Sequence, residues 1–442
     1  MITILSITSC VVKQSSNVSI PTQPLHYNTA LWQGNATEIW DHLQHNSITK
    51  LQAINSTTSD ADQKAWIELA IISKRNSTNT TALAEELLTW RAHYPTHTAN
   101  ALFPDNTSIR QLQQSSSPKQ IALLLPMQGN YAASAQTIRA GFLNAYYATL
   151  SKTAKQNIKF YDTTKSKNVE LLYQQAITDG ADFIIGPLLK ENVQQLYKSS
   201  MLTSATLALN YTDLSMGSLP TNLYEYGLLP EDEAAELADR ATQTGLSHAL
   251  IIAPANAWGK RLATAFSTRW QSLGGHIQNT WYFSAKTDFN QDITRLLKKN
   301  SAGPTNDDQS KQAFDVVFLF GNPQDAHTII PLLHQYDPGK TPIYSTSTIY
   351  SAKTTHDNAI DGVIVCDIPW NMQNTKLQNA NEVQTDRLYA VGQDAYLLSQ
   401  SLSRLKELPN FPIYGTTGAL TLSSSHQIHR RLPCMTIHNG LI

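Results

Sequence analysis

The residue types that carry out chemistry are spread along the 442-residue chain without forming a catalytic or metal-binding motif. No HExxH, paired CxxC, Walker phosphate loop or GxSxG sequence occurs, so no motif indicates zinc, phosphate or hydrolase chemistry. A metal site needs three or four converging ligands, and the closest histidine pairs are His42/His45, His93/His97 and His426/His429. We interpret these pairs as surface residues and predict no metal and no cofactor.

The carboxylates do not form an obvious catalytic pair either. We interpret Asp162, which follows a predicted strand, as a turn residue, and we expect Asp367 to accept hydrogen bonds from main-chain amides. The acidic run 231–233 begins a predicted helix, where the helix dipole is sufficient to explain it. A cell-wall amidase or glycosidase would need two polar residues held at working distance. No such pair stands out, so we predict that the protein is not an enzyme.

Cys366 and Cys434 are the cysteines that remain beyond Cys10. In an oxidising compartment they could form a disulfide bond, provided that folding brings them within reach. A buried, free Cys366 is the alternative, because unpaired cysteines are commonly found in cores. The sequence leaves both possibilities open.

The segment 118–150 is the strongest strand-turn-helix pattern in the chain. Residues 121–125 are an unbroken apolar run, which is too short for a helix and typical of a strand buried on both faces of a parallel sheet. From Tyr131 onward the apolar residues follow helical spacing. This pattern predicts the first βα unit of a doubly wound domain.

The same alternation of strands and helices continues along the chain and predicts two α/β lobes with parallel sheets. We assign residues 119–229 and 371–442 to lobe one and residues 230–370 to lobe two. Further strands are predicted at 158–161, 183–185, 206–209, 224–228, 249–253, 277–283, 316–320, 343–345 and 362–368. A long helix at 382–405 and a terminal hairpin return to lobe one, so several chain crossings should form a hinge.

A different kind of polypeptide precedes this domain. Residues 1–24 are predicted to be a signal remnant and tether, residues 25–104 a small helical domain, and residues 105–118 a Ser- and Gln-rich linker. In the helical part we expect the large side chains to pack between helices rather than to stack on a ligand. These side chains are Trp32, Trp40, Trp66 and Trp90.

Charge and hydropathy exclude some functions. Lys plus Arg number 33 against 34 for Asp plus Glu, so there is no general attraction to nucleic acid or to an anionic membrane surface. No run approaches the roughly 18 apolar residues that a spanning helix requires. We therefore predict no nucleic-acid partner, and any membrane attachment must come from the N-terminal segment.

Six ordered blocks between about residues 118 and 434 resemble one known family. They are IALLLPMQGNYAASAQTIRAGFLNAYY, IIGPLLKENVQQL, LALNY, YGLLPEDEAAELADRA, APANAWGKRLATAFSTRWQSLGG and CDIPW. Together they are similar to the LpoA family, also called LppC, in which a two-lobed domain like that of type I periplasmic binding proteins follows TPR-like helices. Family members are outer-membrane lipoproteins that activate a class A penicillin-binding protein.

This resemblance implies a lipid-anchored regulator of peptidoglycan synthesis that faces the periplasm and has a class A penicillin-binding protein as its partner. Residues 7–10, Ile-Thr-Ser-Cys, resemble a lipobox, so the resemblance assigns the lipid to Cys10. It also implies that the helical part is shorter than in other family members.

A periplasmic solute-binding receptor for a small polar ligand is the alternative, because it uses the same fold. The loops at the carboxyl ends of the strands would then hold the ligand between the lobes. The candidate cleft residues are Gln128, Gly129, Tyr131, Gly186, Pro187, Leu188, Asn210, Tyr211, Asn256 and Trp258. The helical domain argues against this alternative, because a simple transport receptor does not need one.

Overall fold

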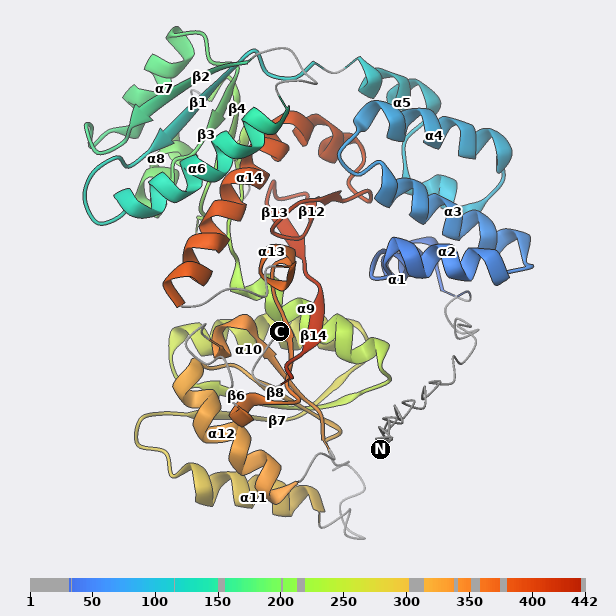
Figure 1. Ribbon diagram of the computed structural model, residues 1–442, viewed down its shortest axis with the longest axis vertical. Coiled ribbons are helices and arrows are strands. Elements are labelled where there is room, and N and C mark those ends of the chain that lie inside the picture. The colour runs from blue at the N-terminus through green and yellow to red at the C-terminus, as the bar shows by residue number, and fades with distance from the viewer. Residues whose placement is uncertain are drawn as a thin grey trace, which may run out of the picture.

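The computed structural model describes residues 32, 34–114, 116–149, 156–199, 202–212, 219–301, 314–337, 341–350, 358–373 and 380–438. A helical domain lies beside two α/β lobes, one above the other in Figure 1. The predicted fold class, an all-α domain followed by two lobes with parallel sheets, is confirmed.

Short helices that begin at polar capping residues form the N-terminal domain. They are α1 (Ala36–Gln44), α2 (Ile48–Thr57), α3 (Ala61–Arg75), α4 (Thr80–His93) and α5 (Asn106–Gln113). Side-chain oxygens of Asn35, Ser47, Asp60, Asn79 and Asp105 accept hydrogen bonds from the first turns. Trp40, Trp66 and Trp90 are buried between the helices, which confirms their predicted packing role.

The predicted linker at 105–118 is wrong in its first part. Residues 106–113 form α5, and the side chains of Ile109 and Leu112 are buried in the helical core. The helical core also includes Leu408 and Phe411, which follow the last long helix of the chain. The helical domain therefore shares its core with the C-terminal part of the sequence.

The first lobe contains a five-stranded sheet in the order β2-β1-β3-β4-β5, in which all pairs are parallel. Its strands are β1 (Gln120–Leu125), β2 (Asn157–Asp162), β3 (Phe183–Ile185), β4 (Ala205–Ala208) and β5 (Leu223–Glu225). Its helices are α6 (Ala132–Thr149), α7 (Val169–Thr178) and α8 (Lys190–Lys198). Every residue of β1 is buried, as its apolar run predicts.

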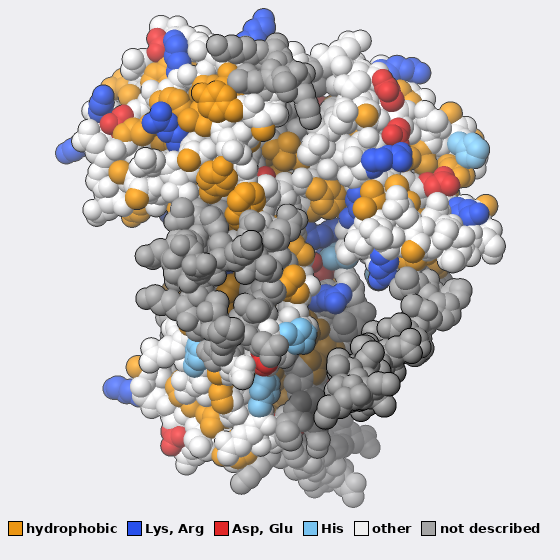
Figure 2. Space-filling model, viewed as in Figure 1, with side chains coloured by type: hydrophobic (Ala, Val, Ile, Leu, Met, Phe, Trp, Pro, Cys, Tyr) orange, Lys and Arg blue, Asp and Glu red, His pale blue; other side chains and the backbone are white. Residues whose placement is uncertain are grey.

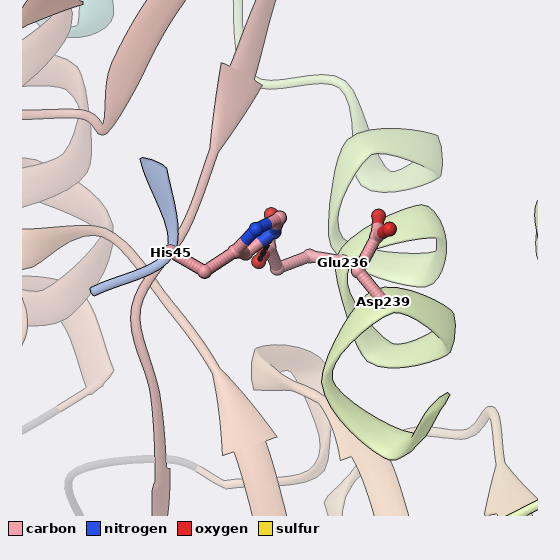
Figure 3. A group of neighbouring side chains, drawn as sticks. All are labelled: His45, Glu236 and Asp239. Atoms are coloured by element: carbon pink, nitrogen blue, oxygen red, sulfur yellow. Dashed lines mark ion pairs between the residues drawn. The ribbon is translucent and has the colours of Figure 1, made fainter. Parts of the chain in front are cut away.

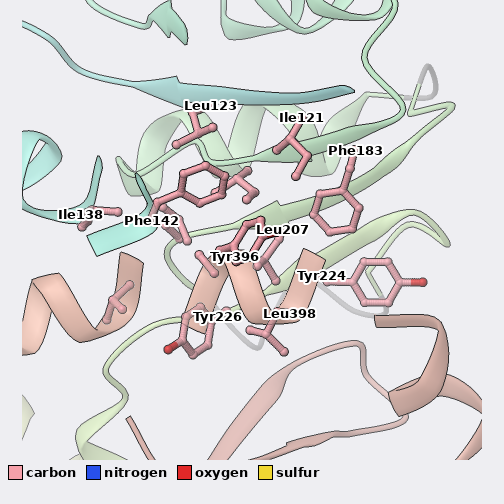
Figure 4. Packing of buried hydrophobic residues seen from close by; sticks show 14 of the residues in the cluster. Ile121, Leu123, Ile138, Phe142, Phe183, Leu207, Tyr224, Tyr226, Tyr396 and Leu398 are labelled. Carbon is pink, nitrogen blue, oxygen red and sulfur yellow. The ribbon is translucent and has the colours of Figure 1, made fainter. Parts of the chain in front are cut away.

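The long helix α14 (Ala380–Glu407) packs closely against α6. A Cβ atom at Gly141 would lie 1.9 Å from the carbonyl oxygen of Tyr389, and one at Gly392 would lie 2.0 Å from that of Ile138. Only glycine allows the two backbones to approach this closely. Beside this contact, Phe142 and Tyr396 pack against the sheet residues Leu123 and Leu207 (Figure 4).

The second lobe contains a six-stranded sheet in the order β14-β10-β9-β8-β6-β7. Its strands are β6 (His248–Pro254), β7 (His276–Phe283), β8 (Val316–Leu319), β9 (Ile343–Thr346), β10 (Ile364–Cys366) and β14 (Cys434–Thr436). Its helices are α9 (Pro230–Gln243), α10 (Ala257–Ser272), α11 (Phe289–Ser301) and α12 (Pro323–Tyr336). Because β14 pairs antiparallel with β10, residues 434–436 belong to this sheet and not, as we expected, to lobe one.

The chain crosses between the lobes at 226–229, at 367–368 and at 432–433. A short helix, α13 (Pro369–Gln373), follows the second crossing, and a small sheet of β11 (Ile413–Tyr414), β12 (Ala419–Leu422) and β13 (Ile428–Arg431) precedes the third. Within the described ranges, none of the helices is long and apolar enough to cross a membrane.

A disulfide bond joins Cys366 of β10 to Cys434 of β14, which are directly opposite each other in the sheet. Of the two possibilities left open above, the structure thus has the bonded pair and not the free, buried Cys366. The bond connects the ends of the second and third crossings within the second lobe.

Candidate functional site: the crossings between the lobes

The first turn of α9 places carboxylates against the crossings. Helix α9 begins with Pro230 and continues with Glu231, Asp232 and Glu233. Glu231 lies at the surface and pairs with Arg261, 2.6 Å away, whereas Asp232 and Glu233 are buried. The helix dipole alone therefore does not explain this acidic run, because two of its three members have buried partners.

Asp232 joins α9 to the end of β13. Its carboxylate accepts hydrogen bonds from His429 Nδ1 (2.9 Å) and from the main-chain amide of Arg430 (3.1 Å). The hydrogen bond to Asp232 raises the pKa of His429, although burial opposes this shift. The guanidinium of Arg430 lies 3.4 Å from the same carboxylate and donates to the carbonyl of Leu229 (3.0 Å). The first and third crossings are therefore held together.

Asp367 holds the main chain of the second crossing in place. Its fully buried carboxylate accepts hydrogen bonds from the main-chain amide of Ile368 (2.7 Å), Asn371 Nδ2 (2.8 Å), Arg387 Nη2 (2.9 Å) and the hydroxyl of Tyr350. This confirms the expectation that Asp367 binds a main-chain amide of the crossing. A carboxylate whose oxygens are occupied in this way is suited to hold a backbone in place.

Glu233 is a second buried carboxylate near Asp367. It accepts hydrogen bonds from the amide (2.9 Å) and the hydroxyl (2.8 Å) of Ser347. Burial raises the pKa of Glu233, and the positive charge of Arg387 partly offsets that rise. Burial also lowers the pKa of Arg387, but the interactions with Asp367, Tyr350 and Glu233 together outweigh burial and leave the pKa raised. Arg387 of α14 therefore interacts favourably with Glu233 of α9 as well as with Asp367.

The helical domain contacts both sides of the crossings, which the sequence did not indicate. Asp41 of α1 pairs with Arg269 of α10 (3.2 Å) and with Arg431 of β13. Burial raises the pKa of Asp41, but Arg431, His45 and Arg269 together outweigh it and lower the pKa. These partners are more than two hundred residues from Asp41 in the chain, so no local pattern reveals them.

The predicted cleft residues of the first lobe lie at the carboxyl edge of its sheet. Gln128 lines a cavity of 640 Å³ together with Arg139, Asp162 and Lys165. Asp162 accepts hydrogen bonds from the amides of Met127 (2.9 Å) and Thr164 (3.0 Å), as a turn residue does. Gly129 and Tyr131 follow in the exposed turn before α6, and the side chain of Tyr131 is 54% exposed.

The other candidate residues of the first lobe pack within that lobe or form hydrogen bonds to it and to the terminal hairpin. Gly186 has a φ of +97°, and a Cβ atom there would lie 2.2 Å from the carbonyl oxygen of Leu124, so this turn requires glycine. Pro187 follows it and is buried. Asn210 Nδ2 donates to the carbonyl of Leu188 (3.0 Å), and the Tyr211 hydroxyl donates to the carbonyl of Ile428 (2.8 Å).

Asn256 and Trp258 lie in the second lobe, where they line a separate cavity of 840 Å³ with Asn322 and Asp325. The side chain of Asn256 also caps α10 by accepting a hydrogen bond from the amide of Gly259 (2.8 Å). Gln128 and Trp258 therefore line different cavities, one in each lobe. A ligand site formed by both lobes stays a prediction.

The interpretation of His45 as a surface residue is wrong. Its side chain is 9% exposed and faces Glu236 of α9 across the boundary between the helical domain and the second lobe. A histidine that follows the last turn of a helix gives no sequence signal for such a contact.

The visible surface shows no large area of one charge. In Figure 2, Lys and Arg side chains lie singly or in small groups over the first lobe and the helical domain, with Asp and Glu between them. This distribution agrees with the balanced composition.

Comparisons with known proteins place these features in context. Residues 15–440 match the model of the family described as "LppC putative lipoprotein". The penicillin-binding protein activator LpoA of Pasteurella multocida is 28% identical over 420 residues, which are 92% of this chain and 69% of that protein.

Two solved structures from Haemophilus influenzae are also similar. Full-length LpoA is 25% identical with a TM-score of 0.64, over 94% of this chain and 75% of that one. The LpoA C-domain, described as a regulator of PBP1A, is 27% identical with a TM-score of 0.62, over 73% of this chain and 98% of that one.

Proposed function

Because the chain belongs to the LppC lipoprotein family, we propose that it activates a class A penicillin-binding protein, a bifunctional peptidoglycan synthase, by binding to it. The observation that carries this proposal is the similarity to full-length LpoA, which extends over 94% of the chain and so includes both the helical domain and the two lobes. A solute-binding receptor would need only the lobes.

The contacts at the crossings support a binding role. The polar groups of Asn210 and Tyr211, which a receptor would direct at a solute, bond to the carbonyls of Leu188 and Ile428. The buried carboxylates Asp232 and Asp367 hold crossings in place and are occupied by protein partners. The surface of the molecule is then available to recognise a protein.

An activator without catalytic groups of its own can act only through differential binding. It must bind the active conformation of the synthase more tightly than the inactive one, and such coupling is typically worth about 1 to 3 kcal/mol, or roughly 5- to 150-fold. The proposed role is therefore that of a regulator and not of an enzyme.

We further propose that the protein is anchored in the outer membrane by a lipid on Cys10 and faces the periplasm. Cys10 lies outside the described residues. The family description and the lipobox-like residues 7–10 support the anchor. The disulfide bond between Cys366 and Cys434 supports an oxidising compartment such as the periplasm.

The test is a peptidoglycan synthesis assay with a purified class A penicillin-binding protein. Residues 12–442 should raise the rate of glycan cross-linking and saturate at one molecule per synthase, and they should leave purified peptidoglycan unchanged when added alone. A class B penicillin-binding protein serves as the control. An unchanged rate over a wide range of concentrations would contradict the proposal.

The solute-binding alternative rests on the 840 Å³ cavity beside Trp258. If it is correct, a small polar solute should raise the melting temperature, and Asn210→Ala with Trp258→Ala should abolish that rise. We expect no amino acid or sugar to produce one.

A further inference from the structure

His45, Glu236 and Asp239 come together where the helical domain meets the second lobe (Figure 3). His45 is the residue directly after α1, whereas Glu236 and Asp239 lie three residues apart on α9 and so share one face of that helix. The side chain of His45 is 9% exposed and that of Glu236 is 6% exposed. The group is therefore built into a boundary between domains and is not part of an open acidic surface.

A hydrogen bond orients the imidazole of His45. Its Nδ1 lies 2.8 Å from the main-chain oxygen of Asp41, which can only accept, so Nδ1 carries a proton and donates. In the neutral ring Nε2 then has a free lone pair, and this atom points towards Glu236 (Figure 3). Metal-binding histidines commonly donate their second nitrogen to a carbonyl in this way.

The unused nitrogen has no hydrogen-bond partner. Nε2 of His45 is buried and lies 3.3 Å from Oε1 of Glu236, yet the two atoms are not aligned for a hydrogen bond. Two ligand atoms that are each about 2.0 to 2.1 Å from a tetrahedral zinc ion are separated by about 3.3 Å. The pair is thus spaced as two ligands of one ion would be.

Asp239 can supply the third ligand. One ligand atom from each of the three residues lies within 4.8 Å of the other two. Arg269 Nε is 3.0 Å from both carboxylate oxygens of Asp239, and Arg269 Nη2 also donates to Oδ1. Since an ionised carboxylate offers about four acceptor positions, these three contacts leave about one position for a metal ion.

The charges around the group favour a cation. Asp41, Glu236 and Asp239 are three carboxylates, and two guanidinium groups, Arg269 and Arg431, pair with Asp41 and Asp239. Glu236 lies against His45, so one negative charge is in excess when the imidazole is neutral. A bound divalent ion would offset the cost of burying these carboxylates.

We propose that His45, Glu236 and Asp239 form a binding site for a zinc-class divalent ion, with water as the fourth ligand, that joins the helical domain to the second lobe. The imidazole selects zinc-class ions over Mg²⁺ and Ca²⁺, which take oxygen ligands. The expectation of no metal was based on histidine spacing, which does not reveal ligands contributed by two domains.

Isothermal titration of the full chain with Zn²⁺ tests the proposal, with Cys10→Ser in every sample so that no free thiol binds the ion. We expect one Zn²⁺ per chain, no comparable binding of Mg²⁺ or Ca²⁺, and at least tenfold weaker Zn²⁺ binding in both His45→Ala and Glu236→Gln. His93→Ala, which removes an exposed histidine of α4, should bind Zn²⁺ like the parent.

Zn²⁺ should also raise the melting temperature of the parent and of His93→Ala but not of Glu236→Gln. Glu236→Gln keeps an oxygen for the amide of Leu432 (3.2 Å), so it provides a folded variant if His45→Ala is unstable. Absence of stoichiometric Zn²⁺ binding in the parent would overturn the proposal. Binding that persists in Glu236→Gln would overturn it equally, because the ion would then occupy other histidines.

Discussion

The indole nitrogen of Trp40 donates a hydrogen bond of 2.6 Å to the main-chain oxygen of Asn410, 370 residues later in the chain. Around this bond, Phe411 contacts the rings of Trp40 and Phe103, at centroid distances of 4.9 and 5.6 Å. The buried side chain of Arg404, on α14, donates a hydrogen bond to the main-chain oxygen of Ser77 in the helical domain. The helical domain and the C-terminal segment are therefore one packing unit.

Replacement of Phe411 tests this shared core. Phe411→Ala should lower the free energy of unfolding of the full chain by about 3 to 5 kcal/mol, because Phe411 is fully buried in the helical core. In a fragment that begins at Pro118 the same change should cost much less, since its helical neighbours are absent. Urea denaturation of the four proteins measures both differences.

Phe142→Ala is the matched control for this comparison. Phe142 is buried between α6 and the first-lobe sheet, away from the helical domain, so its loss should destabilise the chain and the fragment equally. If Phe411→Ala lowered the free energy of unfolding of the full chain and of the fragment by the same amount, the helical domain would contribute nothing to the burial of Phe411.

Lys74 should make the stability of the folded protein depend on pH. Its ammonium group donates to the carbonyl of Gln44 (2.8 Å) and to the Tyr414 hydroxyl, and burial lowers its pKa to about 7. The unfolded chain keeps this proton up to about pH 10.4. Between these values the unfolded state binds more protons, so this group makes stability rise with pH.

Lys74→Met should remove this rise. Its free energy of unfolding, measured in urea from pH 6 to pH 10, should increase less with pH than that of the parent. Lys406→Met, which replaces an exposed lysine near the end of α14, controls for the loss of a positive charge. Identical pH profiles for the parent and Lys74→Met would show that Lys74 keeps its proton in the folded state.

The disulfide bond should contribute substantially to stability. Cys366 and Cys434 enclose 68 residues, so their bond should stabilise the fold by about 4 kcal/mol through the entropy of the unfolded chain. Cys366→Ala with Cys434→Ala should lower the melting temperature, and a reducing agent should lower that of the parent but not that of the double variant. A parent insensitive to reduction under partially unfolding conditions would argue against the bond.

Membrane attachment tests the role of Cys10. In the native host, the parent should fractionate with outer-membrane vesicles, and Cys10→Ser behind a cleavable signal sequence should be released into the periplasm. Cys366→Ala serves as the control because it removes a cysteine of the second lobe. Retention of Cys10→Ser in the membrane fraction would contradict lipid attachment at this residue.

Much of the fold could be predicted because its elements have strong local patterns. The strands Phe183–Ile185, His276–Phe283 and Val316–Leu319 lie where their patterns predict them. Helices α2 and α5 were missed, since each is short and has only two buried residues. Their stability comes from packing against other helices, which a local pattern cannot show.

The interactions at the crossings could not be predicted, because their partners are distant in sequence. Asp232 bonds to His429 and Arg430, almost two hundred residues away. In the sequence it is one of three acidic residues at a helix start, and nothing distinguishes it from Glu231, which pairs at the surface. The hydrogen bond between Asp367 and the main chain could be predicted, because the place of Asp367 beside a crossing already indicated it.

The two contacts of Asp41 have a consequence for any change of angle between the lobes. Arg269 belongs to the second lobe, and Arg431 belongs to the hairpin that packs with the first lobe. A rotation of one lobe relative to the other must therefore alter a contact of α1. By thermodynamic reciprocity, a partner bound to the helical domain and a ligand that favours one lobe angle would change each other's affinity by the same factor.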